Sequence, residues 1–266
     1  MVSNIAKKDL FKLEDHPFFV EVDKNYVPLV EKINAQLGGF EEAFKKRNVP
    51  KKINFTPHEN YRFLVFSKLI AFSNIYRNLK YSHIYISEFH SPKKLEKYGI
   101  HKFDFLTYHY TAHILSYVSI LDIALILTNA VLQLGLSDEE CKYKVVTSKA
   151  GIPSIQNDLD KIGAAVRRHK TTRNQFLHHG KLPNIIDINN SDVLYFLQLL
   201  KSQSKKVKQL NSDYKEGINY LYEAEAKDIL DKLSTDVTEI ENVISGFLNH
   251  LLAAYKIINT AYSKET

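Results

Sequence analysis

The residues best suited to chemistry lie in one short stretch, 172–180, which reads Thr-Arg-Asn-Gln-Phe-Leu-His-His-Gly. Arg173 and Asn174 come first, and the adjacent histidines His178 and His179 follow within about two helical turns. Arginine presents a permanent, planar cation that fits phosphate oxygens. Histidine can give or accept a proton near neutral pH. A cation, an amide and an imidazole so close together suit the cleavage of a phosphodiester without a metal ion.

RNA is the phosphodiester that carries its own nucleophile, the 2′-hydroxyl. Its cleavage needs a base, an acid and a cation for the charge that develops at phosphorus. We assign Arg173 to the cation, His178 to the acid or base with His179 as second choice, and Asn174 to orienting Arg173 or the phosphate. Two chains meeting here would supply two histidines, one for each proton transfer.

Positive charge gathers around the same stretch. The chain has a net charge of +6, and the window 161–181 contains no Asp or Glu. Because RNA binding depends on neutralising phosphates, we expect this window to contact the RNA backbone. The expected RNA-binding residues are Arg167, Arg168, Lys170 and Lys181.

Helical spacing of apolar residues dominates the chain, and only 9 Gly and 7 Pro interrupt it. Pro17, Pro28 and Gly38-Gly39 are expected to limit any early helix. Helices are predicted to begin at Thr56-Pro57 and to cover 104–134, 154–180, 192–207, 214–233 and 235–262, with a break from Ser91 to Gly99.

The predicted fold is all-α, a bundle of long antiparallel helices around one core. Residues 104–264 are expected to form this bundle, and residues 1–103 a mostly helical N-terminal extension of unknown role. On an ideal helix Arg173 falls on the apolar stripe of Leu159, Ile162, Val166 and Leu177, which would turn it towards a helix–helix seam. Alternatively, Thr172 and Gln175 match a capping box, and a new helix would begin at Arg173.

The apolar stretch 114–134 has nearly the length of a membrane span, but Asp122 lies in its middle. We therefore expect a buried helix of a soluble bundle, with Asp122 paired to Arg168 or Arg173. The single Cys141 cannot form an internal disulfide, which suits a cytoplasmic protein.

Other candidate groups are weaker. His109 and His113 have a spacing that can bind a metal, yet no further ligand is evident, so no metal and no cofactor is expected. A second Arg-Asn pair precedes His83, at Arg77, and no glycine follows that histidine. Tyr108, Tyr110 and Tyr117 could stack bases, although aromatic residues at helical spacing more often line a core.

Arg-Asn-x-x-x-His followed closely by Gly, late in a helical chain, resembles the HEPN superfamily, whose members share Arg, four to six residues and then His. The resemblance covers about residues 104–264 and assigns the motif to Arg173, Asn174 and His178, with His179 at a permitted spacing. The His-x-Tyr variant of the family is absent. The resemblance implies a helical homodimer with facing motifs and metal-independent endoribonuclease activity, in toxin–antitoxin, abortive-infection or other antiviral systems.

The sequence therefore predicts an RNA-cleaving homodimer that needs no membrane and has an antitoxin or inhibitor protein as a further partner. Two alternatives stay open. The chain would be a non-catalytic helical module that binds RNA or a protein through its basic face, or an interaction protein that binds no nucleic acid.

Overall fold

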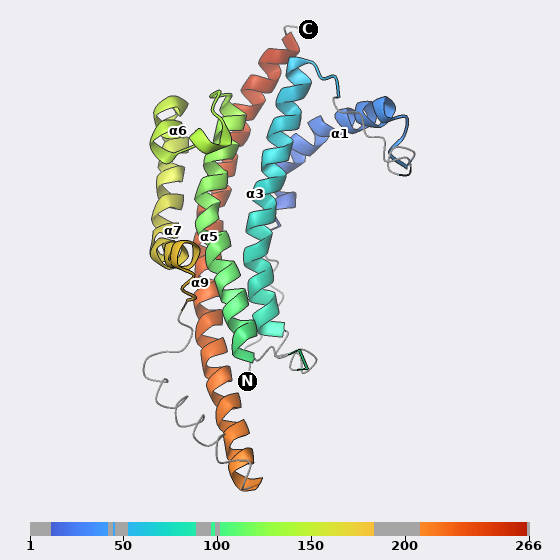
Figure 1. Cartoon of the computed structure of the whole chain (residues 1–266). Helices are drawn as coiled ribbons and strands as arrows, with labels where there is room; N and C mark the ends of the chain where they lie inside the picture. The colour runs from blue at the N-terminus through green and yellow to red at the C-terminus, as the bar shows by residue number, and fades with distance from the viewer. Residues whose placement is uncertain are drawn as a thin grey trace. The chain divides into compact units, whose positions relative to one another are not determined.

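The structure, a computed structural model, describes residues 12–41, 45, 53–88, 97–98, 102–183 and 208–264. Within these residues the protein is an all-α helical bundle without a strand, as predicted (Figure 1). The helices are α1 (Pro17–Leu37), α3 (Pro57–Glu88), α5 (Lys102–Leu132), α6 (Tyr143–Ala150), α7 (Pro153–His179) and α9 (Lys208–Lys264). The helix predicted over 192–207 and most of the break predicted from Ser91 to Gly99 lie outside the described residues.

The chain divides into two compact units. Unit 1 comprises Met1–Ile75, Ser119–Ala164 and Ile240–Thr266, and unit 2 comprises Tyr76–Val118 and Ala165–Glu239. The helices α3, α5, α7 and α9 each contribute one end to each unit. The predicted division of the chain at residue 103 stays a prediction.

Each unit has its own buried apolar core. In unit 1 the ring of Phe18 meets that of Tyr255 at 5.9 Å, and Phe72 meets Phe247 at 6.3 Å. In unit 2, where α3, α5 and α9 run side by side, the buried cluster consists of Ile86, Leu106, Tyr222, Ala226, Ile229 and Leu233. This second core packs α3, α5 and α9 against one another within unit 2.

The predicted start of α3 is confirmed in detail. Thr56 Oγ1 accepts a hydrogen bond from the Glu59 amide at 3.2 Å, and Glu59 Oε2 accepts one from the Thr56 amide at 2.7 Å. Pro57 takes the first helical position, where its missing N–H costs nothing. The reciprocal bonds satisfy donors that would otherwise lack partners at the helix end.

The expectation that proline limits an early helix is wrong for Pro28. Pro28 lies inside α1, which continues to Leu37 and ends at Gly38 with a left-handed φ of 68°. Pro28 has no N–H for the carbonyl one turn earlier, at Lys24. The helix persists because its other face is buried through Phe18, Phe19, Val22, Leu29 and Ile33.

The predicted separation of two helices at residue 234 is also wrong, because α9 runs unbroken through this point. The polar residues at the junction fit inside a helix. Ser234 Oγ lies 3.0 Å from His83 Nε2, and Thr235 Oγ1 donates to the Asp231 carbonyl at 2.9 Å. Since neither residue is Gly or Pro, the backbone ladder is not interrupted.

The apolar helix predicted over 104–134 is α5. It is the one described helix with the length and apolarity to cross a membrane, and 67% of its most apolar window is buried within the protein. That degree of burial is typical of a core helix. Asp122, however, is exposed, so it is not the buried carboxylate that we expected in this helix.

Replacing Pro28 with Ala is expected to raise the free energy of unfolding by about 1–3 kcal/mol, because the new N–H can donate to the Lys24 carbonyl. Pro28 is exposed, so little packing is lost. Pro17→Ala is the matched control, and it should change stability by less than about 0.5 kcal/mol because the first helical N–H has no partner within the helix. Urea unfolding followed by circular dichroism measures both, and a less stable Pro28→Ala variant would contradict this account.

Candidate functional site

The 172–180 stretch forms the last two turns of α7. The helix is continuous from Pro153 to His179, so the alternative in which a new helix begins at Arg173 is wrong. Leu159, Ile162 and Val166 are buried as predicted, but Leu177 is 54% exposed. The apolar stripe therefore ends before the last turn, and Gly180 terminates the helix with a left-handed φ of 64°.

The four predicted catalytic residues do not share one face of this helix end. Arg173 and Asn174 are half-buried, and Arg173 Nη1 donates to Asn174 Oδ1 at 3.2 Å. His178 and His179 are exposed in the last turn. At about 100° per residue, Asn174 and His178 lie about 40° apart around the helix, whereas Arg173 and His178 lie about 140° apart. Within one chain, the Asn174 amide therefore lies on the same side of α7 as the His178 imidazole, whereas the Arg173 guanidinium does not.

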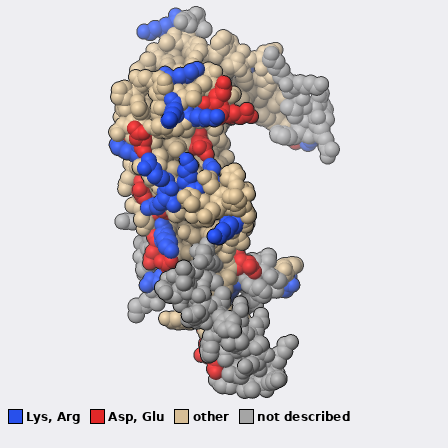
Figure 2. Space-filling view, turned by 60° about the vertical axis from the view of Figure 1, so that its left-hand side comes forward, with Lys and Arg blue, Asp and Glu red and all other residues tan. Residues whose placement is uncertain are grey.

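All four predicted RNA-binding residues, Arg167, Arg168, Lys170 and Lys181, are exposed. Figure 2, which turns the side carrying α7 forward, shows Lys and Arg side chains gathered near mid-height. Arg168 differs from the other three because its guanidinium forms an ion pair with Asp236 and a second with Glu239 at 2.6 Å. Two carboxylates thus already compensate this positive charge.

The structure brings together a polar cluster in unit 2 that the motif alone does not indicate. The carboxylate of Asp236 on α9 is 3% exposed, and its Oδ2 lies 3.0 Å from His113 Nε2 and 2.8 Å from His169 Nε2. Its Oδ1 forms the ion pair with Arg168. Side chains from α5, α7 and α9 therefore converge on one buried carboxylate. We call Asp236, His113, His169 and Arg168 the Asp236 cluster.

Tyr117 covers one side of the Asp236 cluster. Its ring stacks on His113 at 5.9 Å between centroids and meets His169 edge to face at 5.4 Å. Its hydroxyl accepts a hydrogen bond from Arg168 Nη2 at 3.2 Å. The side chain is fully buried, so Tyr117 lines the core, which is the alternative that the sequence favoured over base stacking. It covers the imidazoles of His113 and His169.

The charge states of the cluster follow from burial and pairing. Burial works to raise the pKa of Asp236, but the hydrogen bonds of His113 and His169 outweigh it, and the pKa lies below its ordinary value of 3.8. Burial lowers the pKa of His113 below 6.5, and the hydrogen bond to Asp236 offsets only part of that effect. At neutral pH the cluster thus holds an ionised carboxylate, a guanidinium and a neutral His113.

The signal that could have revealed the cluster was present in the sequence. His169 follows Val166 by three residues on the buried stripe of α7, and Asp236 follows Leu233 by three on the buried stripe of α9. A titratable residue on an apolar stripe must find a partner. We assigned that partner role to Asp122, whereas the acids that pair with Arg168 are Asp236 and Glu239.

The remaining candidates do not form a site of this kind. His109 stacks on Tyr85 at 4.8 Å instead of joining His113, and the described residues contain no group of three His, Cys, Asp or Glu side chains placed to hold a metal. The second motif is also separated, since Arg77 is exposed while His83 is half-buried against Ser234. Tyr108 is 69% exposed and Tyr110 is half-buried.

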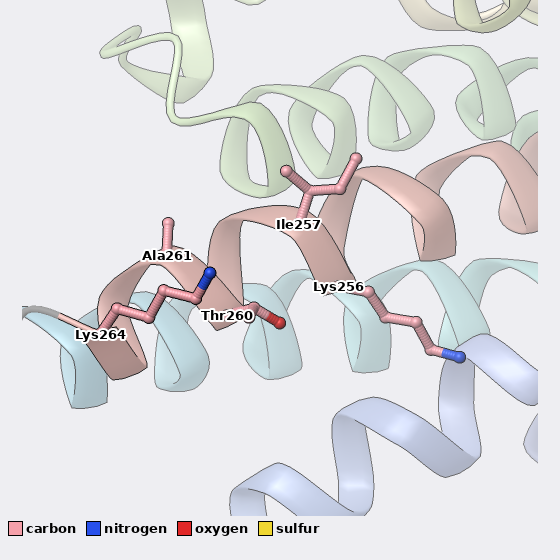
Figure 3. A pocket seen from close by; sticks show the side chains of 5 residues that line it. All are labelled: Lys256, Ile257, Thr260, Ala261 and Lys264. Atoms are coloured by element: carbon pink, nitrogen blue, oxygen red, sulfur yellow. The ribbon is translucent and has the colours of Figure 1, made fainter.

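A shallow surface hollow lies on the C-terminal turns of α9, in unit 1 (Figure 3). It is lined by Lys256, Ile257, Thr260, Ala261 and Lys264, all from one helix. These side chains include neither a carboxylate nor an imidazole. Because acid–base chemistry needs such groups, we place the candidate site at the end of α7 and not here.

Asp236→Asn is expected to lower the free energy of unfolding by about 3 kcal/mol, because it leaves Arg168 and two histidines without their shared anion. Glu239→Gln is the matched control. The Glu239 side chain is 43% exposed, and water screens its ion pair with Arg168, so the loss should stay below about 1 kcal/mol. Urea unfolding at neutral pH measures both variants, and equal losses would show that Asp236 is not the centre of the cluster.

The free energy of unfolding is also expected to fall as the pH drops from about 7 to about 5. The pKa of His113 is lower in the fold than its ordinary 6.5, so the unfolded chain takes up the proton first and gains stability relative to the fold. The contribution of neutral His113 to the free energy of unfolding is complete above pH 6.5 and is lost as the pH falls below it. His113→Gln should flatten this slope relative to the unchanged chain. An identical slope in both proteins would mean that His113 does not titrate in this way.

The candidate site is thus the end of α7, braced by the Asp236 cluster one turn before Arg173. Both parts lie in unit 2. Comparison of the chain with protein-family models, with curated protein sequences and with solved structures gave no match in any of the three.

Proposed function

We propose that the protein is a metal-independent endoribonuclease with a HEPN-like helical bundle over residues 104–264 and an N-terminal helical extension. The observation that carries this proposal is the arrangement at the end of α7. Arg173 and Asn174 are hydrogen-bonded at 3.2 Å, and His178 and His179 stand exposed immediately before a left-handed glycine. An oriented arginine and solvent-accessible histidines are the groups that metal-free cleavage of RNA requires.

The reaction assigns one task to each side chain. A histidine takes the proton from the 2′-hydroxyl, and O2′ forms a bond to phosphorus. The bond from phosphorus to O5′ breaks, and a protonated imidazole gives its proton to the leaving O5′. Arg173 stabilises the added negative charge on the phosphate oxygens. The products are a 2′,3′-cyclic phosphate and a 5′-hydroxyl. The reaction requires neither a metal ion nor a redox partner.

The fixed orientation of Arg173 supports the cation role. Its neighbour one turn earlier on the same face is His169, which is held at 2.8 Å by Asp236. The end of α7 cannot rotate without breaking that contact. The amide oxygen of Asn174 accepts from the guanidinium and further restricts it. A preorganised charge stabilises a transition state without reorganisation at the moment of reaction.

Helix geometry favours a homodimer for this chemistry. Arg173 and His178 of one chain are about 140° apart around α7, so they face different directions. A second chain related by twofold symmetry would place its own histidine opposite the first Arg173 and supply the separate acid and base. A toxin–antitoxin or antiviral defence setting, in the cytoplasm and with an antitoxin or inhibitor protein as partner, completes the proposal by resemblance to the HEPN superfamily.

Purified protein is expected to cleave RNA in the presence of EDTA and to leave 2′,3′-cyclic phosphate ends. Arg173→Ala should reduce kcat by about 10²–10³-fold, because it removes the transition-state cation. His178→Ala, or the double variant His178→Ala/His179→Ala if His179 substitutes, should reduce it by about 10²–10⁴-fold. Arg77→Ala is the matched control, since Arg77 also precedes an asparagine but its motif is dispersed, and it should leave the rate unchanged. Product analysis by gel and mass spectrometry measures these rates.

Two results would overturn the ribonuclease proposal. One is loss of cleavage in EDTA, and the other is full activity in the double histidine variant. Salt-sensitive RNA retention without any product would favour the non-catalytic binding module. Absence of RNA retention at low salt would favour an interaction protein that binds no nucleic acid.

A further inference from the structure

The exposed large apolar side chains of the two units differ in kind. Among the described residues of unit 1 they are aliphatic or Phe, namely Val20, Val27, Phe40, Phe63, Leu64, Ile70, Val145 and Ile257. In unit 2 they are chiefly tyrosines, namely Tyr81, Tyr85, Tyr98, Tyr108 and Tyr220, together with Leu177 and Leu182. The exposed apolar surface of unit 2 is therefore mostly made of rings that carry a hydroxyl.

Three of these tyrosines belong to one connected group of rings. Tyr85 stacks on His109 with centroids 4.8 Å apart, and Tyr81 meets Tyr85 edge to face at 6.4 Å. His109 also contacts Phe105 at 4.4 Å and Tyr108 at 5.1 Å. Tyr81, Tyr85 and Tyr108 remain 45%, 41% and 69% exposed. We call these five side chains the aromatic face.

Rigid helices hold the aromatic face in place. Tyr81 and Tyr85 are four residues apart on α3, and Phe105 and His109 are four apart on α5, so each pair lies on one side of its helix. The two helices run side by side (Figure 1). Ile86 and Leu106, which directly follow Tyr85 and Phe105 in the sequence, are fully buried in the core of unit 2. Because the rings are already ordered, binding a flat partner costs little side-chain entropy.

The aromatic face and the basic part of α7 are linked inside unit 2 by side chains of α5, of which His113 and Tyr117 are fully buried. Phe105, His109, His113 and Tyr117 follow one another at intervals of four residues along α5. This stripe leads over about 18 Å from the aromatic face to Tyr117. There Tyr117 contacts Arg168 and His169 of α7. The same helix exposes Arg167 and Lys170, which can bind phosphates.

We infer that the aromatic face stacks the bases of a single-stranded RNA whose phosphates contact α7. Exposed aromatic rings suit bases, which are planar and stack on Tyr, Phe and His irrespective of their sequence. Bases inside a duplex are stacked on each other and cannot enter. The substrate of the proposed ribonuclease is therefore single-stranded RNA. The identity of the substrate depends on the proposed function, whereas the stacking surface does not.

The decisive experiment measures binding without cleavage. The probe is a fluorescent 2′-O-methyl oligonucleotide of about twelve nucleotides, which lacks the 2′-hydroxyl nucleophile and spans the stripe with its flanking residues. A second probe of equal length carries the phosphates without bases. The unchanged chain should bind the first probe at least about tenfold more tightly than the second. Fluorescence anisotropy at fixed salt gives both Kd values.

Variants of the aromatic face test whether its rings cause the tighter binding of the base-carrying probe. Tyr85→Ala/Tyr108→Ala should weaken binding of the base-carrying probe at least about tenfold and leave the abasic probe unaffected. Tyr85→Phe/Tyr108→Phe keeps both rings and should bind like the unchanged chain. Tyr220→Ala is the matched control, because Tyr220 is 75% exposed in the same unit but outside the aromatic face, and it should change nothing.

Equal binding of the two probes, no binding of either, or unchanged affinity in the double alanine variant would each overturn the inference. A double alanine variant that dissociates a dimer in sedimentation, with its affinity for the probe unchanged, would make the aromatic face a contact between chains and also overturn it. A chain that binds the base-carrying probe through these rings but does not cut RNA would overturn the ribonuclease proposal alone.

Discussion

The buried carboxylate of Asp236 is the interaction on which the rest of unit 2 depends. An unpaired carboxylate at 3% exposure would cost several kcal/mol of desolvation, so the fold must bring partners to it. It does so from two other helices, with His113 on α5 and both Arg168 and His169 on α7. If any of these helices shifted by one turn, the Asp236 carboxylate would be buried without its partners. The cluster thereby fixes the register of α7, and with it the place of Arg173.

Much of the helical architecture could be predicted from the sequence, because it depends on local rules. The capped start of α3 at Thr56, the apolar α5 and the glycine end of α7 all follow from residues within a turn of each other. The errors arise where packing overrides a local signal. Pro28 is tolerated because the opposite face of α1 is buried. At Ser234 neither Gly nor Pro interrupts α9, and the polar side chain finds a partner in His83 of another helix.

The candidate site, like the fold, could be predicted only in part from the sequence. The composition of the 172–180 stretch could be predicted, since it is contiguous and lies in an acid-free window. For the Asp236 cluster, the buried stripes indicated only that His169 and Asp236 each needed a partner. Which residues meet could not be predicted, because the members are separated by up to 123 positions and meet only through tertiary packing. Asp122 was a plausible partner from sequence, being mid-helix among apolar residues, yet it points to solvent. Which side of a helix is buried depends on neighbours that a single sequence does not specify.

The ending of α7 at Gly180 has a consequence for the free energy of binding at this helix end. A side chain at Gly180 would meet no atom within 4 Å, so the left-handed backbone alone makes glycine suitable there. This reversal lets the amides of Gly180 and Lys181 donate to the carbonyls of Phe176 and Gln175 at 2.9 and 3.2 Å, which closes the backbone of the last turn. Arg173 is braced one turn beyond the Asp236 cluster, whereas the side chains of His178 and His179 are exposed. Ordering these two imidazoles therefore adds an entropic cost to every binding event that uses them.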